Sequence, residues 1–287
     1  MSFWRFSATS NHEHGDVWYP PYFQGLYTHP MQILRTITWL APGLPIRLFE
    51  RVCESLETEL DIPVSLESRT KLSGPAIGSL DPFAENRADL GFLCGPAAVP
   101  SAVRTAGGFE LLGLAPLFDD PRYAGKPTCF CDLVVRDDCD IGGLDDLQNK
   151  AFGYNDTSSL SGWLGLASAL QQRGTRIPTF FASVTETGGH IASLRAVRAG
   201  SIDVASIDSN VLRTHPGILD GLRVVDSVGP WPSQPVVVRS TLSQQMKTKV
   251  KMTLTRCGPW MDIGFVGFRP QSYKDLDAVP SAKTGKS

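Results

Sequence analysis

The feature that most limits the folds open to this chain is an alternation of apolar strands and amphipathic helices that begins twice. The first series opens with a strand at 33–40, and its first helix has apolar residues every three or four positions from Ile46 to Leu60. The second series starts near residue 129 and continues to residue 227. Such alternation predicts parallel sheets covered by helices on both faces, with ligands bound beyond the carboxyl ends of the strands.

A chain of 287 residues is long enough for two domains. We therefore predict an α/β fold with two Rossmann-like lobes joined by a two-stranded hinge, whose crossings lie near Phe130 and Val236. The stretch 229–235, rich in Pro, interrupts the second series, and the strand after it is expected to return to the first lobe. The expected organisation is an N-terminal extension at 1–30, lobe 1 at 31–131 plus 235–287, and lobe 2 at 132–234.

Within the second series we expect strands at 151–155, 179–183, 204–207 and 222–227, and a helix at 162–173. The helix prediction depends on the helical spacing of Trp163, Leu166 and Leu170, and on Gly174 as a stop signal.

Composition and charge narrow the classes of partner. Lys and Arg total 27 against 29 Asp and Glu, a net charge of -2, so no basic excess favours nucleic acid. No segment has the apolar length of a membrane span. Residues 1–25 lack the pattern of a signal peptide, which was either never there or removed. Six cysteines in a chain of this length lean mildly toward a reducing compartment.

A candidate anion site lies where the strand 151–155 runs into a helix. The first turn of a helix leaves backbone N–H groups without intrahelical partners and carries partial positive charge. Ser158, Ser159 and Ser161 add hydroxyl donors beside those groups, so an oxyanion could bind there with little formal positive charge nearby. The simpler alternative is that one serine caps the helix and nothing binds.

Two more candidates also follow strand ends. His190 comes after two glycines at the start of a predicted helix, and Asp208 ends the strand 204–207. Each has an ordinary structural explanation, because His190 can bond to backbone at a helix start and Asp208 can cap the next helix. Strand ends of one sheet edge bring serines, imidazole and carboxylate into one crevice, and this favours a binding site.

These segments resemble the phosphonate and phosphate-type solute-binding proteins of ABC transporters, which are type II periplasmic-binding proteins. The resemblance covers roughly 33–269 and is carried by FDDPRY at 118–123, YND at 154–156, SLSG at 159–162, TGGH at 187–190, ASIDSN at 205–210 and GPWP at 229–232. It implies a small anionic ligand, an ABC permease as partner, no cofactor, no catalysis and a periplasmic location, although a cytoplasmic one stays open. It also implies that Ser159, Ser161, His190 and Asp208 hold the oxyanion.

The sequence departs from the family pattern in two places. Leu160 stands where the family's Ser-Thr-Ser turn has a hydroxyl, and the loops 69–74 and 94–98 hold none of the tyrosines that often cover the ligand. These changes leave the identity of the anion open. If Asp208 faces it, a protonated oxyanion or a ligand carrying N–H is favoured, because two negative charges repel.

Two other functions remain open at this stage. An enzyme on the same scaffold, resembling the thiamine-pyrimidine synthases, would use Cys94 or His190 as nucleophile or base. A ligand-sensing domain would report its ligand to a partner protein. For metal binding, Cys129 and Cys131 share one strand face with Cys94 as a further ligand, and His12 and His14 form a second group, but we predict no metal.

Overall fold

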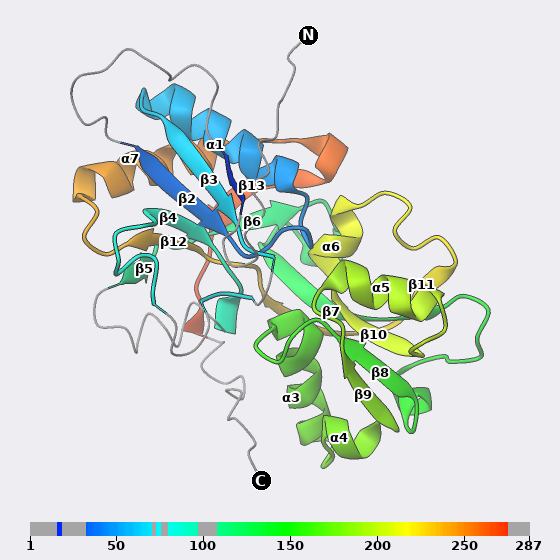
Figure 1. Cartoon of the computed structure of the whole chain (residues 1–287). Helices are drawn as coiled ribbons and strands as arrows, with labels where there is room; N and C mark the ends of the chain where they lie inside the picture. Colours follow the sequence, from blue (N-terminus) through cyan, green and yellow to red (C-terminus); the bar gives the residue numbers. More distant parts are fainter. Residues whose placement is uncertain (1–15, 19–32, 71–72, 76–79, 97–107, 275–287) are drawn as a thin grey trace.

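The computed structural model describes residues 16–18, 33–70, 73–75, 80–96 and 108–274 of the chain, which form two lobes (Figure 1). The first lobe contains a six-stranded sheet in the order β1-β3-β2-β4-β12-β5. Its strands are β1 (Asp16–Trp18), β2 (Leu34–Thr38), β3 (Val64–Ser68), β4 (Leu90–Phe92), β5 (Phe109–Leu111) and β12 (Val236–Arg239). The central strands β3, β2 and β4 run parallel, as the alternation predicted, while β1, β12 and β5 pair antiparallel to their neighbours.

The second lobe contains a five-stranded sheet in the order β11-β7-β10-β8-β9. Its strands are β7 (Thr128–Arg136), β8 (Ala151–Tyr154), β9 (Ser183–Glu186), β10 (Val204–Asp208) and β11 (Leu222–Pro232). The strands β10, β8 and β9 are parallel, so the segments that follow β8 and β10 leave the sheet at the same edge. This edge carries the residues predicted to bind an anion.

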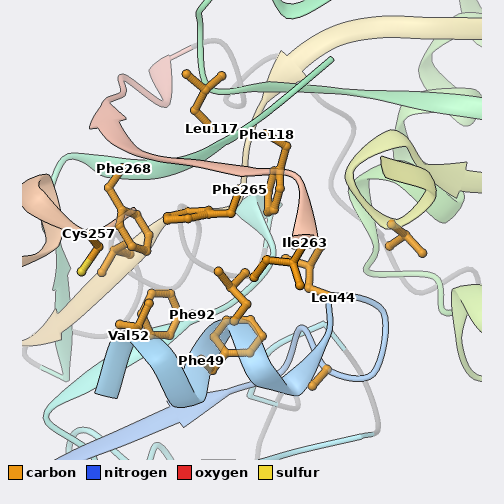
Figure 2. Close-up of a cluster of buried hydrophobic side chains, with 14 of the residues drawn as sticks. Leu44, Phe49, Val52, Phe92, Leu117, Phe118, Cys257, Ile263, Phe265 and Phe268 are labelled. Carbon is orange, nitrogen blue, oxygen red and sulfur yellow. The ribbon is translucent and has the colours of Figure 1, made fainter. Parts of the chain in front are cut away.

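Helices cover the sheets because each has one apolar face. In the first lobe, α1 (Ile46–Leu60) and α7 (Gln244–Arg256) lie together against the sheet, and a two-stranded sheet of β6 (Leu114–Phe118) and β13 (Phe265–Pro270) completes the core. Figure 2 shows Phe49 and Val52 of α1 directed at Phe92, beneath Phe265 and Phe268 of β13. The rings of Phe49 and Phe92 have centroids 5.2 Å apart.

In the second lobe the helices lie on opposite faces of the sheet. Alternate residues of β7 show this, because Val134 packs with the side of α5 (His190–Arg198) while Leu133 and Val135 pack with the side of α3 (Gly165–Gln172). The shorter helices are α4 (Ile177–Phe180) and α6 (Ser209–Thr214). No helix among the described residues combines the length and apolar character needed to cross a bilayer.

Two chain segments connect the lobes, one between β6 and β7 and one between β11 and β12. The strand β12 pairs with β4 and β5, which confirms that the chain returns to the first lobe after residue 235. The exact lobe boundaries at 31–131, 132–234 and 235–287 stay a prediction.

Three predicted elements of the second lobe are wrong in detail. Residues 177–180 form α4 instead of a strand, because Pro178 occupies its first turn and Thr179 bonds back to the backbone of Arg176. The strand predicted at 222–227 continues to Pro232, because Trp231 and Pro232 pair with Cys129 and Thr128. The helix predicted from residue 162 begins earlier, as a π-helical turn at Leu160–Leu164.

Candidate functional site

The segment 158–161, called the serine turn below, follows β8 and lies at the boundary between the two lobes. Its residues 159–161 are buried. Ser159 caps the helix, since its hydroxyl accepts the N–H of Gly162 at 3.1 Å. The hydroxyl of Ser158 donates to the carboxylate of Asp156. Two of the three candidate serines thus use their hydroxyls for local hydrogen bonds. The capping alternative predicted such a bond for one serine. That Ser158 and Ser159 bind the ligand stays a prediction.

The backbone of this turn is irregular in a way that leaves one N–H donor without an acceptor. The N–H groups of Trp163 and Leu164 both donate to the carbonyl of Ser159, at 3.2 and 2.9 Å, which makes the first turn π-helical. The N–H of Leu160 donates to Cys94 Sγ at 3.4 Å. Within the described part of the chain the N–H of Ser161 has no such acceptor, so it is available to an anion. Single π turns occur often at functional sites.

Ser161, His190 and Asp208 lie close together, as expected for residues that follow the carboxyl ends of parallel strands. The hydroxyl of Ser161 donates to Asp208 Oδ2 at 3.4 Å and lies 3.2 Å from His190 Nε2. Because a serine hydroxyl has a single proton, His190 donates its Nε2–H to Ser161 in this arrangement. The three side chains therefore form one chain of hydrogen bonds at the start of a helix.

The two carboxylate oxygens of Asp208 have different roles. Oδ1 accepts the N–H of Asn210 at 2.8 Å and so caps α6, which is the structural role the sequence also allowed. Oδ2 accepts from Ser161 and from Gln234 Nε2. Burial raises the pKa of Asp208 from 3.8 to about 7, against the opposing effect of its hydrogen-bond donors. Near neutral pH this carboxyl is therefore partly protonated and can donate to an oxyanion.

His190 follows Gly188 and Gly189 directly and is the first residue of α5, so it stands at a helix start as expected. Gly188 has φ +81°, a conformation that a residue with a side chain rarely adopts. Burial lowers the pKa of His190 from 6.5 to about 4, while the carboxylate of Asp156 and the backbone of Ser206 oppose this. At neutral pH the imidazole is uncharged, so the site lacks a formal positive charge from this group.

The first lobe covers the site through three contacts. Ser73 Oγ donates to Asp156 Oδ2 at 2.7 Å, and Cys94 accepts the N–H of Leu160. The loop after β2 lies against His190, since a Cβ added to Gly43 would be 3.8 Å from that ring. Ser161 and Asp208 are 3% and 5% exposed. A ligand can reach them only when the lobes separate.

Several residues of the site were missed by the sequence analysis. Gln234 lies in the second connection between the lobes, and Asp156 ends the YND segment at 154–156. Tyr273, near the C-terminus, is buried in a small cluster with Cys94 and Leu160, outside the two loops in which tyrosines were sought. No local pattern distinguishes Gln234 or Tyr273, because each reaches the site through long-range packing.

Thiols and metal-binding groups add no second site. Cys94, Cys129 and Cys131 are buried free thiols whose pKa values are raised by burial. The described residues contain no cluster of three or more His, Cys, Asp or Glu able to hold a metal ion. The other predicted metal group, at residues 12 and 14, falls outside them.

A cavity of about 360 Å³ lies at the other end of β2 from the serine turn. Its polar lining is Asp89, held between the guanidinium groups of Arg35 and Arg239. One carboxylate balances only one of the two guanidinium groups, so this cavity has a net positive charge, but it lies away from the residues predicted to bind the anion.

Solved structures with the same fold include one protein bound to methylphosphonate and one component of a phosphonate transporter. PhnD1 from Prochlorococcus marinus, solved with methylphosphonate, has a TM-score of 0.70 at 16% identity over 85% of this chain and 96% of its own. A binding protein component of an ABC phosphonate transporter from Pseudomonas aeruginosa has a TM-score of 0.67 at 17% identity over 84% of this chain and 82% of its own. A Xanthomonas citri protein bound to ATP has a TM-score of 0.59 at 18% identity over 84% of this chain and 91% of its own. At identities this low, the structural similarity establishes the shared fold and nothing more.

Among curated proteins, none matches the sequence. The family described as "ABC transporter, phosphonate, periplasmic substrate-binding protein" matches residues 45–276, which is most of the chain. That description is of a substrate-binding protein and not of a catalyst, so the enzyme alternative is set aside. The chain belongs to the family of periplasmic substrate-binding proteins of phosphonate ABC transporters.

Proposed function

We propose that this protein captures a small phosphonate- or phosphate-type oxyanion between its lobes, through Ser161, His190 and Asp208, and delivers it to an ABC permease. The observation that carries the proposal is the hydrogen-bonded cluster of these three side chains at the start of a helix, at the boundary between the lobes. The family described above supports the ligand class and the transport role.

The chemistry of the cluster favours an anion that still carries a proton. Neither lysine nor arginine hydrogen-bonds to these three side chains in the described part of the chain, so neutral donors and the helix start must hold the charge. Asp208 repels a ligand once it ionises, because two negative charges then meet in a buried site. With its pKa raised to about 7, we expect affinity for an oxyanion to fall as pH rises above neutrality.

Isothermal titration calorimetry with methylphosphonate, inorganic phosphate and sulfate tests this proposal. Ser161→Ala removes a hydroxyl that faces the ligand and should weaken methylphosphonate binding about tenfold, the size of one hydrogen bond to a charged group. Ser159→Ala is the matched control, because its hydroxyl caps the helix. It should lower the stability by about 1 kcal/mol and leave affinity nearly unchanged.

A second arm compares pH 6 and pH 8.5. The parent should bind methylphosphonate more weakly at the higher pH, and Asp208→Asn should lose much of this dependence. If the parent binds none of the three anions, or if Ser161→Ala and Ser159→Ala bind alike, the assigned site is wrong.

A further inference from the structure

Both segments that connect the lobes carry buried polar side chains that converge on one residue. Tyr123 lies in the first connection, and Ser233 and Gln234 lie in the second. All three are buried, and so is Asn210 in the first turn of α6, which they contact. Buried polar groups need hydrogen-bond partners, so the partners chosen here are informative.

Asn210 joins the two connections through its side-chain amide. Its Oδ1 accepts the hydroxyl of Tyr123 at 2.8 Å. Its Nδ2 donates to Ser233 Oγ and to Gln234 Oε1, both at 3.3 Å. The amide of one residue thus holds both crossings of the hinge.

Gln234 extends this network into the binding site. Its Oε1 faces Asn210, and its Nε2 donates to Asp208 Oδ2 at 2.5 Å. Asp208 Oδ1 is already held by the backbone of α6, so Oδ2 is the oxygen that both Gln234 and Ser161 contact. One oxygen atom therefore links the site to the hinge.

A side-chain amide has a donor end and an acceptor end, which makes this chain of contacts directional. If Oδ2 gains a proton that points at Gln234, the Gln234 amide accepts it by rotating to present Oε1. That rotation places its NH₂ group toward Asn210, which must rotate in turn. Tyr123 then accepts from Asn210 and donates to Ser209 Oγ, which is 2.7 Å from its hydroxyl. Ser233 Oγ, which donates to Gln234 Oε1 at 2.9 Å, must turn as well, and the protonation state of Asp208 chooses between the two arrangements.

We propose that Gln234 and Asn210 form an amide relay that transmits the state of Asp208 to both connections between the lobes, with Gln234 as a positioning residue of the site. The proposal rests on the binding role proposed above for Asp208. The relay explains why side chains that carry both a donor and an acceptor are buried at the hinge. Apolar side chains in the same place would need no hydrogen-bond partners.

The other titratable groups around Asp208 do not replace it as the controlling group. They are Asp132 of β7, the thiols of Cys94, Cys129 and Cys131, the phenol of Tyr123, and His190 across Ser161. Burial raises the pKa of each thiol and of the phenol, so none of these ionises near neutral pH. Asp132 is paired with Arg122.

The decisive variant is Tyr123→Phe, because it removes the last hydroxyl of the relay and leaves the side chains of the site in place. Tyr154→Phe is the matched control, since that hydroxyl bonds to Glu186, outside the relay. Two quantities are measured for the parent and both variants between pH 5 and pH 8.5. The first is the affinity for methylphosphonate, and the second, without ligand, is the difference in unfolding free energy caused by Asp208→Asn.

We expect Tyr123→Phe to change methylphosphonate affinity about tenfold, within the usual range of coupling between sites, and to move the pH midpoint of the Asp208 titration. Tyr154→Phe should change neither.

A second variant, Gln234→Met, keeps the side-chain length but removes the amide, and Gln171→Met on the exposed face of α3 is its control. Gln234→Met should move the same midpoint upward, because the carboxylate loses a donor.

The outcomes separate this proposal from the proposed function. If the parent binds neither methylphosphonate nor inorganic phosphate, the function is wrong, and the ligand-free titration of Asp208 still decides the relay. If Gln234→Met has an effect but Tyr123→Phe titrates and binds like the parent, Gln234 is a local contact and the relay is overturned. The same conclusion follows if neither variant moves the midpoint.

Discussion

The buried pair of Asp208 and His190 should give this protein two pH dependences of stability that oppose each other. Asp208 has a folded-state pKa of about 7 against an ordinary value of 3.8, and His190 has a pKa of about 4 against an ordinary value of 6.5. Between pH 4 and 6.5 the native state binds the proton of Asp208 that the unfolded chain releases. Over the same range the unfolded chain binds the proton on His190 that the native state excludes.

The signs follow from linkage between proton binding and folding. The contribution of Asp208 is fully present at low pH and is lost as pH rises toward 7. The contribution of His190 is absent at low pH and is gained as pH rises to 6.5. Since one pKa unit corresponds to about 1.4 kcal/mol, the window from pH 4 to 6.5 gives about 3 kcal/mol for each group, with opposite signs. For His190 this is an upper bound, because the residue as a whole is only partly buried.

The perturbation is to remove one group at a time. In Asp208→Asn only His190 still contributes a pH dependence of stability. The free energy of unfolding should therefore rise by about 3 kcal/mol from pH 4 to 6.5 relative to the parent. In His190→Gln the dependence of Asp208 stands alone, and the free energy should fall by about the same amount. The double variant should follow the parent in slope, since both titrations are then absent.

Urea unfolding followed by tryptophan fluorescence at five pH values measures these slopes, and comparison with the parent cancels the other titrating groups. Parallel curves for the parent and both single variants would refute the reasoning. They would mean that neither side chain is held uncharged by burial, and the expected loss of anion affinity above pH 7 would lose its cause.

Two further predictions concern the packing around the site. Arg122→Met should lower the free energy of unfolding by about 3 kcal/mol, because it leaves the fully buried carboxylate of Asp132 without its cation. Arg173→Met, which breaks a pair with an exposed partner, should cost less than about 1 kcal/mol in the same urea assay. Gly165→Ala should cost about 1–3 kcal/mol by thermal unfolding, because its Cβ would lie 2.3 Å from Cys131 Sγ. An unchanged melting temperature in Gly165→Ala would contradict this packing.

Sequence patterns predicted the parts of this protein that depend on local periodicity. The spacing of apolar residues located α1, and the repeated strand-to-helix alternation predicted the parallel strands of both sheets, but not the strands that pair antiparallel beside them. Three of the candidate residues, Ser161, His190 and Asp208, come together because they follow strands or precede helices at one sheet edge. That reasoning needs only chain order and the geometry of parallel strands.

The failures mark where long-range contacts decide local structure. Pairing with β7 extends β11 through a stretch rich in Pro that reads as a break. The start of the helix after β8 moves to Leu160, where contacts with Ser159 and Cys94 shape a π-helical turn.

By itself, the sequence determined the class of fold, the position of the serine turn and the three side chains of the candidate site, because each follows from patterns a few residues long. The tertiary structure decided which hydroxyls remain for a ligand, and it brought Gln234 to Asp208 and Cys94 to Leu160. These choices depend on the packing of segments far apart in the chain, and on the burial that raises the pKa of Asp208 and lowers that of His190. No local pattern records burial at that depth, because solvent is excluded only when both lobes are in place.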